Sequence, residues 1–281
     1  MLIIRSIKEM QQIAKQFRAE GNTIGYVPTM GYLHEGHLSL IHNARQNNDK
    51  VVISIFVNPL QFGPNEDFDA YPRDIKRDEA LAEGAGVDII FYPEVQEMYP
   101  VELSTCIHVK KRVNVLCGAS REGHFDGVAT VLLKLFNIVM PDKAYFGMKD
   151  AQQVAVVDGL VQDYNIPVEL IPVDTVREED GLAKSSRNVY LNEQERKEAP
   201  AIYQSLQKAV QSMQGGKKDI EQIKAGIRSK ISERTSGEID YIEIYSYPEL
   251  EVLKELNGKM IIAVAVKFSK ARLIDNITFN L

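Results

Sequence analysis

Apolar and polar positions in the first part of the chain alternate between the periods of helices and strands. The stretch "SIKEMQQIAKQF" (6–17) repeats apolar residues at helical spacing. "TIGYVP" (23–28) predicts a short strand that Pro28 ends, and "VVISIFV" (51–57) is a continuous apolar, largely β-branched run. Such a run is typical of a strand buried on both faces of a parallel sheet.

The alternation continues as far as Val176. A helix closed by glycine, "RDIKRDEALAEGAG" (73–86), precedes the buried strand "VDIIFYP" (87–93). A long core helix, "DGVATVLLKLFNIVM" (126–140), precedes the strand "KAYFG", the helix "DAQQVAVVDGLVQDY" and the strand "VELIPVDTV". This order predicts the α/β class, with a doubly wound, Rossmann-like parallel sheet and right-handed crossovers over 1–177.

The pattern changes after Val176. Two polar amphipathic helices, "LNEQERKEAPAIYQSLQKAVQSM" (191–213) and "KKDIEQIKAGIRSKISER" (217–234), are followed by strand patterns at 239–246, 260–269 and 271–279. They predict a smaller α+β domain over 178–281, and 281 residues are enough for two hydrophobic cores. The charged stretch "REEDGLAKSSRN" (177–188) reads as a linker or a functional loop.

Charge and composition narrow the classes of partner. The formal net charge of -6 argues against a general affinity for nucleic acids or anionic membranes, but it leaves room for a small basic site. Two cysteines are too few for a disulfide framework. The start "MLIIRSIKEMQQ" does not fit a signal peptide, and no apolar run approaches the roughly 20 residues of a membrane span. We therefore expect a cytoplasmic protein.

Three of the five histidines, His34, His37 and His42, fall within "VPTMGYLHEGHLSLIHNA" (27–44). A zinc-hydrolase helix needs H-E-x-x-H, whereas this pattern is H-E-G-H without an evident third ligand. A surface turn with incidental histidines explains His42 well, but it explains the pair poorly. In a doubly wound sheet, ligands bind beyond the carboxyl ends of the strands, where helix N-termini attract phosphate. Imidazoles placed there can donate hydrogen bonds to a triphosphate, so we favour an anion site.

Several blocks carry a resemblance to a known family. "HEGH" after "PTMGYL" is similar to the HIGH signature of the nucleotidylyl-transferase superfamily, and "KSSRN" (184–188) looks like the K-M-S-K-S-type partner loop with an arginine as its last basic residue. Together with "SIFVNPLQF", "YPRD", "GHFDGVATVLLKLFNIVMPDKAYFGMKDAQQ" and "SSRNVYL", these blocks resemble the pantoate–β-alanine ligases. The matching segments run from near the N-terminus to about Leu191.

The resemblance implies an ATP-dependent ligase that joins pantoate to β-alanine in two steps. Pantoate would attack the α-phosphate of ATP to give pantoyl adenylate and pyrophosphate, and β-alanine would then release pantothenate and AMP. Mg²⁺ is expected because ATP normally reacts as its magnesium complex. A homodimer is also implied.

The resemblance also assigns residues by position. His37 and His34 would contact the phosphates, with His37 the better proton or hydrogen-bond donor, and Lys149 would add a point charge. Gln61 and Gln153 would bind pantoate from opposite sides of a pocket, and Ser185, Ser186 and Arg187 would close over ATP as a lid. The implied ATP-binding set is Met30, Gly31, Tyr32, Leu33, His34, Glu35, Gly36, His37, Gly147, Met148, Lys149, Asp150, Val176, Lys184, Ser185, Ser186 and Arg187.

Some roles stay open at this stage. Asp150 could be a helix N-cap instead of a ribose contact. Asn58 could bind substrate, or its amide could do no more than hold the loop. His124 could cap the helix that follows it or line the pantoate side, while Asp78 is a candidate contact for Mg²⁺.

Other functions compete with the ligase. A nucleotidyltransferase would yield a dinucleotide instead of AMP. A tRNA-charging enzyme is disfavoured by the acidic charge and by the lack of an evident anticodon-binding extension. A metal- or nucleotide-sensing module would bind its ligand without turnover.

Overall fold

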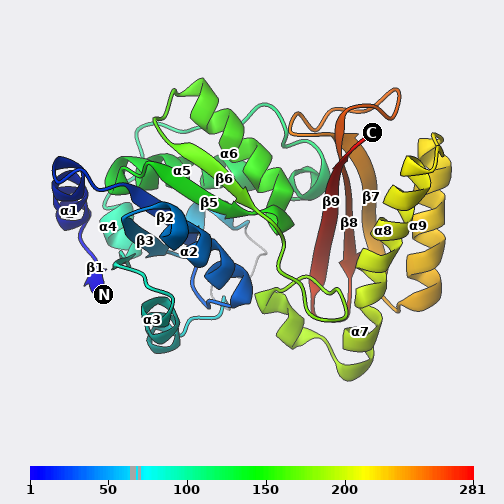
Figure 1. The fold of residues 1–281 in the computed structure, drawn as a ribbon, viewed down its shortest axis with the longest axis horizontal. Coiled ribbons are helices and arrows are strands. Elements are labelled where there is room, and N and C mark those ends of the chain that lie inside the picture. The colour runs from blue at the N-terminus through cyan, green and yellow to red at the C-terminus, as the bar shows by residue number, and fades with distance from the viewer. Residues whose placement is uncertain (64–67, 69–70) are drawn as a thin grey trace. The chain divides into compact units, whose positions relative to one another are not determined.

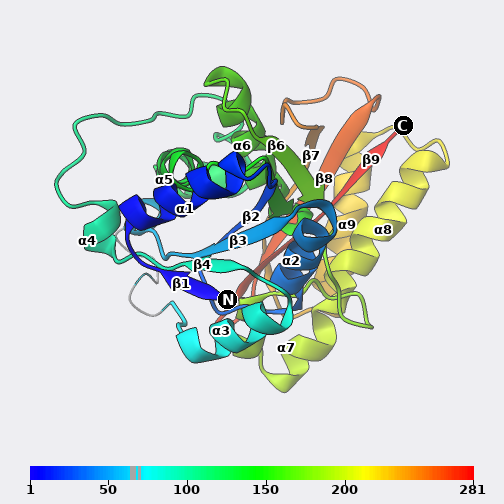
Figure 2. The ribbon, with the colours of Figure 1, turned by 60° about the vertical axis from the view of Figure 1, so that its left-hand side comes forward.

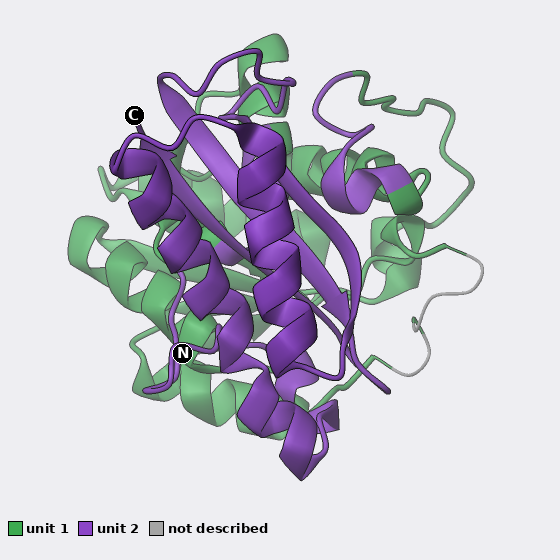
Figure 3. Ribbon diagram, turned by 90° about the vertical axis from the view of Figure 1, so that its right-hand side faces the viewer, with its two compact units in different colours: residues 1–110, 120–148, 156–174 green, residues 111–119, 149–155, 175–281 purple. Residues whose placement is uncertain are grey.

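The computed structural model describes residues 1–63, 68 and 71–281. These residues divide into two compact units, coloured separately in Figure 3. Unit 1 comprises Met1–Lys110, Ser120–Met148 and Val156–Asp174, and unit 2 comprises Lys111–Ala119, Lys149–Ala155 and Thr175–Leu281. Two short segments from the first part of the sequence therefore belong to unit 2. The domain boundary between 177 and 178 stays a prediction.

Unit 1 is built on a parallel sheet of six strands in the order β1-β4-β3-β2-β5-β6. The strands are β1 (Leu2–Ile4), β2 (Ile24–Thr29), β3 (Lys50–Ile55), β4 (Ile89–Phe91), β5 (Lys143–Gly147) and β6 (Glu169–Val173). The run Val51–Ile55 is buried throughout, as expected for a strand covered on both faces. The predicted α/β class with a doubly wound parallel sheet is confirmed.

Helices cover both faces of this sheet. The helices that include residues of unit 1 are α1 (Ile7–Ala19), α2 (Glu35–Asn47), α3 (Ile75–Gly84), α4 (Val95–Met98), α5 (His124–Val139) and α6 (Ala151–Asp163). Helices α1 and α5 pack together on one face, whereas α2 packs on the other face and against α3 (Figure 2). The core on the α2 side includes Leu33, Ile41, Ile53 and Ile90, all with no exposed surface.

The order of the strands fixes where a ligand can bind in unit 1. The chain passes from β2 to β3 on one side, while β5 lies on the other side of β2 (Figure 1). Strand order therefore reverses at β2, and in sheets of this kind ligands bind beyond the carboxyl ends of the strands at the reversal. The residues that follow β2 are Met30–His34, the start of the histidine motif.

Unit 2 contains an antiparallel sheet of three strands in the order β7-β8-β9. Its strands are β7 (Glu238–Ser246), β8 (Lys259–Lys267) and β9 (Arg272–Asn280), and its helices are α7 (Glu193–Glu198), α8 (Pro200–Gln214) and α9 (Ile220–Arg234). Helices α8 and α9 lie side by side over one face of the sheet (Figure 3). Apolar side chains such as Leu206, Ile227 and Val264 fill the space below them. The predicted smaller α+β region is confirmed.

The structure corrects three details of the sequence-based prediction. Strand β2 does not end at Pro28 but continues to Thr29. Its pairing with β5 covers only Gly25 and Tyr26, so the missing N–H of Pro28 breaks no bond on that side. The single helix predicted over 191–213 is two helices, because Pro200 begins α8 and cannot continue α7. Strand β1 was not predicted at all.

The described residues were also searched for membrane-spanning segments. None of their helices combines the length and the apolar character that crossing a bilayer requires.

Candidate functional site

The turn after β2 is held by one buried carboxylate. Gly31 and Tyr32 both have positive φ, at 84° and 52°, so the chain reverses sharply here. The Asp78 carboxylate, on α3, accepts the backbone N–H groups of Tyr32 and Leu33, each at 2.7 Å. Asp78 is only 1% exposed. Burial raises the pKa of its carboxyl, although both hydrogen bonds and the Arg77 charge act in the opposite direction.

The N-terminus of α2 is capped by two histidines. His34 is the N-cap residue, and its Nδ1 accepts the N–H of Gly36 at 3.1 Å. The N–H of His34 in turn donates to Nδ1 of His37 at 3.3 Å. An N–H can donate only to a ring nitrogen that carries a lone pair, so Nδ1 is unprotonated in both rings. In the neutral imidazoles the proton is therefore on Nε2, which becomes the donor of each ring.

Gly36 makes this arrangement possible. A Cβ at this position would lie 2.8 Å from Cε1 and 2.9 Å from Nδ1 of His34, closer than real Cβ atoms approach other atoms. The two imidazoles lie with their centroids 4.1 Å apart. The glycine of "HEGH" is therefore required for the packing of the first histidine over the helix start.

Gln61 ends the 3₁₀ turn Pro59–Gln61 that follows β3. Its Nε2 donates to the Sδ atom of Met30 at 3.0 Å, and its Oε1 accepts from Nδ2 of Asn58. Asn58 is 1% exposed and also bonds the carbonyl of Gly127. Within unit 1 the fold thus brings Gln61 to Met30, whereas Asn58 holds the turn, one of the two roles considered for it.

His124 fixes the same turn from α5. Its Nδ1 lies 2.8 Å from the carbonyl oxygen of Gln61, and its Nε2 lies 3.0 Å from Nη1 of Arg121. A carbonyl can only accept and a guanidinium can only donate, so Nδ1 carries the proton and Nε2 accepts. The N-cap of α5 is Gly123, and no side chain caps the helix. Of the two roles considered for His124, helix capping is therefore wrong.

In unit 2, Lys149 and Asp150 belong to the 3₁₀ turn Met148–Asp150. Nζ of Lys149 lies 3.6 Å from Oδ2 of Asp150, and the Lys149 side chain is 20% exposed. Nδ2 of Asn276, on β9, donates to the Lys149 carbonyl at 2.9 Å and fixes its backbone. The half-buried Gln153 follows on the first turn of α6.

Ser185, Ser186 and Arg187 form the start of a 3₁₀ turn in unit 2. Ser185 is its N-cap, and the Ser185 Oγ accepts the N–H of Arg187 at 3.2 Å. All three are partly exposed, and among the described residues Arg187 has no ion-pair partner. Val176 lies just upstream and accepts the N–H of Lys184 at 2.9 Å. The turn therefore presents a guanidinium that no described carboxylate compensates, beside two hydroxyl groups.

Comparison with known proteins identifies the family. The family model for pantoate–β-alanine ligase matches residues 2–278. The chain belongs to the pantoate–β-alanine ligase family. It is 63% identical over 281 residues to a pantothenate synthetase from Geobacillus sp. (strain WCH70), covering all of both chains. It is also 63% identical over 278 residues to the enzyme of that name from Bacillus subtilis (strain 168), covering 99% of this chain and 97% of that one.

Solved structures agree with this assignment. A pantothenate synthetase from Thermus thermophilus is 44% identical and superposes with a TM-score of 0.92, covering 99% of each chain. A pantoate–β-alanine ligase from Francisella tularensis, crystallised with β,γ-ATP and β-alanine, is 36% identical with a TM-score of 0.81. It covers 99% of this chain and 97% of that one. The resemblance drawn from the sequence is confirmed.

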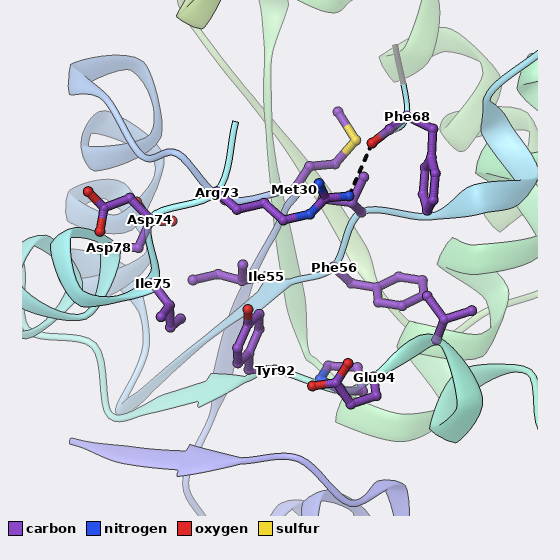
Figure 4. A pocket seen from close by; sticks show the side chains of 14 residues that line it. Met30, Ile55, Phe56, Phe68, Arg73, Asp74, Ile75, Asp78, Tyr92 and Glu94 are labelled. Carbon is purple, nitrogen blue, oxygen red and sulfur yellow. Dashed lines mark hydrogen bonds between the residues drawn. The ribbon is translucent and has the colours of Figure 1, made fainter. Parts of the chain in front are cut away.

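The ligase has a pocket at the carboxyl edge of its parallel sheet, in unit 1 (Figure 4). The cavity volume is about 160 Å³. Its lining is mainly apolar, and Met30 and Gly31 of the β2 turn form part of it together with Ile55, Phe56 and Tyr92. Arg73 in the same lining donates to the backbone carbonyl of Phe68 at 3.1 Å. The turn that leads to the histidines therefore also forms part of the lining of this mainly apolar pocket.

The sequence makes Asp78 a candidate contact for Mg²⁺, which often takes only one or two protein ligands. Across residues 1–63, 68 and 71–281, no group of three His, Cys, Asp or Glu side chains could hold a metal ion. Each oxygen of Asp78 accepts one backbone N–H group and keeps a second lone pair, so its contact with Mg²⁺ stays a prediction.

The remaining positions named from the sequence in the β2 turn, α2 and β5 differ in burial and in backbone contacts. The Leu33 side chain has no exposed surface, and its N–H is used by Asp78. Glu35 begins α2 and is exposed, and His42 is exposed farther along the same helix. Gly147 ends β5 with open space where a Cβ would lie.

Sequence reasoning missed Gln152, which is 6% exposed. Its Nε2 donates to the carbonyls of Arg112 at 2.9 Å and Val115 at 2.7 Å, so it fixes the segment 112–115. The pair "QQ" gave no signal for which glutamine faces inward, since one step along a helix changes its face.

Proposed function

We propose that the ligase condenses pantoate with β-alanine to pantothenate through enzyme-bound pantoyl adenylate. A pantoate carboxylate oxygen attacks the α-phosphorus of ATP, and the bond to the β,γ-pyrophosphate breaks. The β-alanine amine then attacks the activated carbonyl carbon, the C–O bond to AMP breaks, and the amine loses a proton. Family membership supports the overall condensation, and the β,γ-ATP complex of the Francisella enzyme supports ATP as the energy source.

The observation that carries the proposal is the pair of capped imidazoles at the N-terminus of α2. The capping contacts occupy Nδ1 of His34 and His37, so Nε2–H is the donor group of each neutral ring. The N–H groups and the positive dipole end of a helix attract phosphate at the same place. Charge builds up on the phosphate oxygens as the leaving group departs, and donors fixed in advance stabilise that charge without reorganisation. His37 is the stronger candidate for this role.

The proposed ATP-binding residues come from three segments. The first segment is the turn and helix start at 30–37. The second is Gly147–Asp150, in which Lys149 supplies a point charge. The third consists of Val176 and Lys184–Arg187. A guanidinium and two hydroxyls suit phosphate oxygens, and Arg187 is not compensated by an ion pair with a described residue. The nucleotide is taken as MgATP, with the metal as part of the substrate.

Gln61 and Gln153 are the proposed pantoate contacts. A neutral amide can bind the hydroxyl and carboxylate groups of pantoate and leave the carboxylate nucleophilic. A cation in the same place would reduce that nucleophilicity. The Gln61 side chain already lies against Met30, next to the turn that leads to the histidines. Holding the carboxylate in line with the phosphorus lowers the entropic part of the barrier.

An oxygen-transfer experiment tests the adenylate. Pantoate labelled with ¹⁸O in its carboxylate is incubated with the ligase, MgATP and β-alanine, and the products are examined by mass spectrometry. In the adenylate route one carboxylate oxygen becomes the bridge to phosphorus and leaves with AMP. We therefore expect AMP that carries one ¹⁸O atom and unlabelled pyrophosphate.

Two results would contradict this route. Label in inorganic phosphate, with ADP as the nucleotide product, indicates an acyl phosphate instead. A dinucleotide product indicates nucleotidyl transfer to a phosphate acceptor. Omitting β-alanine provides the control, since pantoate alone should support exchange of labelled pyrophosphate into ATP.

Assembly and location follow the family resemblance. We propose a homodimer in the cytoplasm, where ATP is available. Sedimentation equilibrium of the purified chain tests the dimer.

A further inference from the structure

A tight hairpin precedes the Ser185–Arg187 turn in unit 2. Arg177 and Ala183 form a β-bridge, and the N–H of Glu178 donates to the carbonyl of Leu182 at 2.8 Å. The N–H of Gly181 donates to the carbonyl of Glu178 at 2.9 Å and closes the tip. The second strand of the hairpin ends at Ala183, so the Ser185–Arg187 turn follows it almost immediately.

The base of this hairpin is anchored on β9. The guanidinium of Arg177 bonds both oxygens of Asp275, at 2.7 and 2.9 Å. The Asp275 side chain is 5% exposed, so this bidentate pair is well shielded from water. The same guanidinium lies 3.4 Å from the ring centroid of Tyr203, on α8. The hairpin is therefore fixed to both the sheet and the helix layer of unit 2.

Glu178 connects the hairpin to the Ser185–Arg187 turn. Its Oε2 accepts from Nη2 of Arg196 at 2.5 Å, and its Oε1 accepts from Nδ2 of Asn188 at 3.3 Å. Asn188 also donates through Nδ2 to the carbonyl of Ala183, and its N–H donates to the carbonyl of Ser185 at 3.1 Å. The Asn188 side chain thus spans the two ends of the turn that contains Ser185, Ser186 and Arg187.

Arg196 is itself held in place from the other side. It lies on α7, and its Nη1 bonds Oδ2 of Asp180 at 2.6 Å. Helix α7 is fixed by Glu195, whose carboxylate accepts the N–H groups of Asn192 and Ser269, both at 2.9 Å. A continuous set of contacts therefore runs from Ser269 through Glu195, α7, Arg196, Glu178 and Asn188 to the serine–arginine turn.

We propose that Glu178 is a positioning residue for ATP binding. It holds the Ser185–Arg187 turn in its anion-binding conformation through Asn188, while Arg196, which also pairs with Asp180, offsets part of its charge. This inference rests on the proposed function, in which Arg187 contacts the phosphates of ATP. A carboxylate so close to an anion-binding turn would by its charge alone weaken ATP binding, whereas its contact with Asn188 holds the turn in place. Both of its oxygens face donors, which only a carboxylate can satisfy together.

Glu178→Gln is the first variant, with Glu179→Gln as its matched control. The glutamine amide would turn an NH₂ group toward either Arg196 or Asn188 and break one of the two contacts. Glu179 is exposed in the same hairpin, so its variant removes the same charge without breaking a contact between described residues. Asn188→Ala breaks the connection from the turn and leaves the two Arg196 ion pairs in place.

The measurements are KM for ATP, KM for pantoate, kcat and thermal midpoint. We expect Glu178→Gln and Asn188→Ala each to raise KM for ATP about tenfold, the loss expected for one hydrogen bond to a charged group. KM for pantoate should stay unchanged, and Glu179→Gln should match the wild type. A role limited to stability would instead lower the thermal midpoint and leave KM for ATP unaltered well below it. That result, or an equal effect of Glu179→Gln, overturns the inference.

A double-mutant cycle with Arg187→Ala separates this inference from the proposed function. If Glu178 acts through the turn, Glu178→Gln should add little to KM for ATP once the Arg187 side chain is absent. If Arg187→Ala weakens ATP binding and the two effects add, Glu178 does not act through the turn. That result would overturn the inference about Glu178 and leave the proposed function standing. If Arg187→Ala leaves KM for ATP unchanged, the proposed role of the turn fails and the inference fails with it.

Discussion

The backbone N–H of His34 donates to Nδ1 of His37 across 3.3 Å, while Nδ1 of His34 accepts the N–H of Gly36. Helix capping and the presentation of two Nε2–H donors are therefore one structural feature. Protonation at Nδ1 would abolish the caps, since a protonated nitrogen cannot accept. The geometry favours neutral imidazoles that act as hydrogen-bond donors.

His37→Asn should separate these two functions. The amide oxygen of asparagine can take the place of Nδ1 and accept the His34 N–H, but no donor remains at the Nε2 position. We expect the pantoate-dependent exchange of pyrophosphate into ATP to fall about 100-fold, the usual cost of one transition-state donor, with little change in the thermal midpoint. His42→Asn, exposed on the same helix, is the control and should behave as the wild type. Undiminished exchange in His37→Asn would remove His37 from the chemistry.

Gly36→Ala should impair activity with only a small loss of helix stability. The new Cβ would lie 2.8 Å from Cε1 of His34 and push the imidazole away from its cap. Alanine gains up to about 1 kcal/mol in helix propensity, which offsets part of the lost cap. Gly226→Ala on α9 is the matched control, because nothing lies within 4 Å of its Cβ position. We expect the control to raise the thermal midpoint and keep full activity, whereas Gly36→Ala loses most of its turnover. Equal turnover in both variants would contradict the steric argument.

The regular elements of both units followed from local patterns. "KAYFG" became β5 with the predicted bounds, and the buried run from Val51 became β3. Pro200 was a visible signal for a break between two helices. The amphipathic pattern on both sides of it nevertheless led to the prediction of one helix over 191–213. Strand β1 was missed because three residues carry too little periodicity, and it exists through pairing with β4.

The histidine site followed from the sequence only in part. The spacing of "HEGH" after a strand indicated a helix N-terminus, and the structure has His34 at the cap. The contact between His124 and the Gln61 carbonyl joins residues 63 positions apart. The role of Asp78 likewise depends on how α3 packs against the β2 turn. Such contacts come from tertiary packing, and no local pattern in one sequence encodes them.

Gly127→Ala should act on pantoate through the Gln61 turn. A Cβ at Gly127 would overlap the Leu60 carbonyl group and approach the Gln61 nitrogen to 2.7 Å, so the turn must move. Overpacking of this kind typically costs about 1–3 kcal/mol. We expect a higher KM for pantoate and a smaller change in KM for ATP in steady-state assays. Gly84→Ala, with open space at its Cβ position, is the control. If KM for pantoate stays at the wild-type value, Gln61 does not bind this substrate.

Asp78→Asn should disturb the β2 turn more than the overall stability. Asparagine keeps one acceptor but turns an NH₂ group toward one of the two backbone N–H donors. The buried carboxylate also carries a desolvation cost, which raises the pKa of Asp78, and the neutral amide relieves it. We therefore expect a net loss of only about 1 kcal/mol in the free energy of unfolding, but a clear rise in KM for ATP. Asp74→Asn is the control, since asparagine caps α3 equally well. A wild-type KM for ATP in Asp78→Asn would show that the turn conformation does not control nucleotide binding.

Glu195 should make the stability of unit 2 sensitive to acid. The N–H groups of Asn192 and Ser269 hold the pKa of the Glu195 carboxyl below its ordinary value of 4.5. The folded state therefore binds this proton less readily than the unfolded state, and stability rises with pH across the interval between the two pKa values. The contribution of the ionised Glu195 carboxylate to the free energy of unfolding is complete above pH 4.5. It is lost as the pH falls through the lower pKa of the folded state. Glu195→Gln should lower the urea midpoint at about pH 7 by more than it does at about pH 3.5.

The control for this experiment is Glu193→Gln, an exposed position in the first turn of the same helix. Its urea midpoint should differ little from that of the wild type at either pH. Because α7 carries Arg196, Glu195→Gln should also raise KM for ATP at neutral pH, whereas Glu193→Gln should not. A midpoint difference for Glu195→Gln that is equal at both pH values would mean that its carboxylate has the same proton affinity in the folded and unfolded chain. The contacts to Asn192 and Ser269 would then contribute nothing through its charge, and α7 would depend on its other contacts, which include the Arg196 ion pairs.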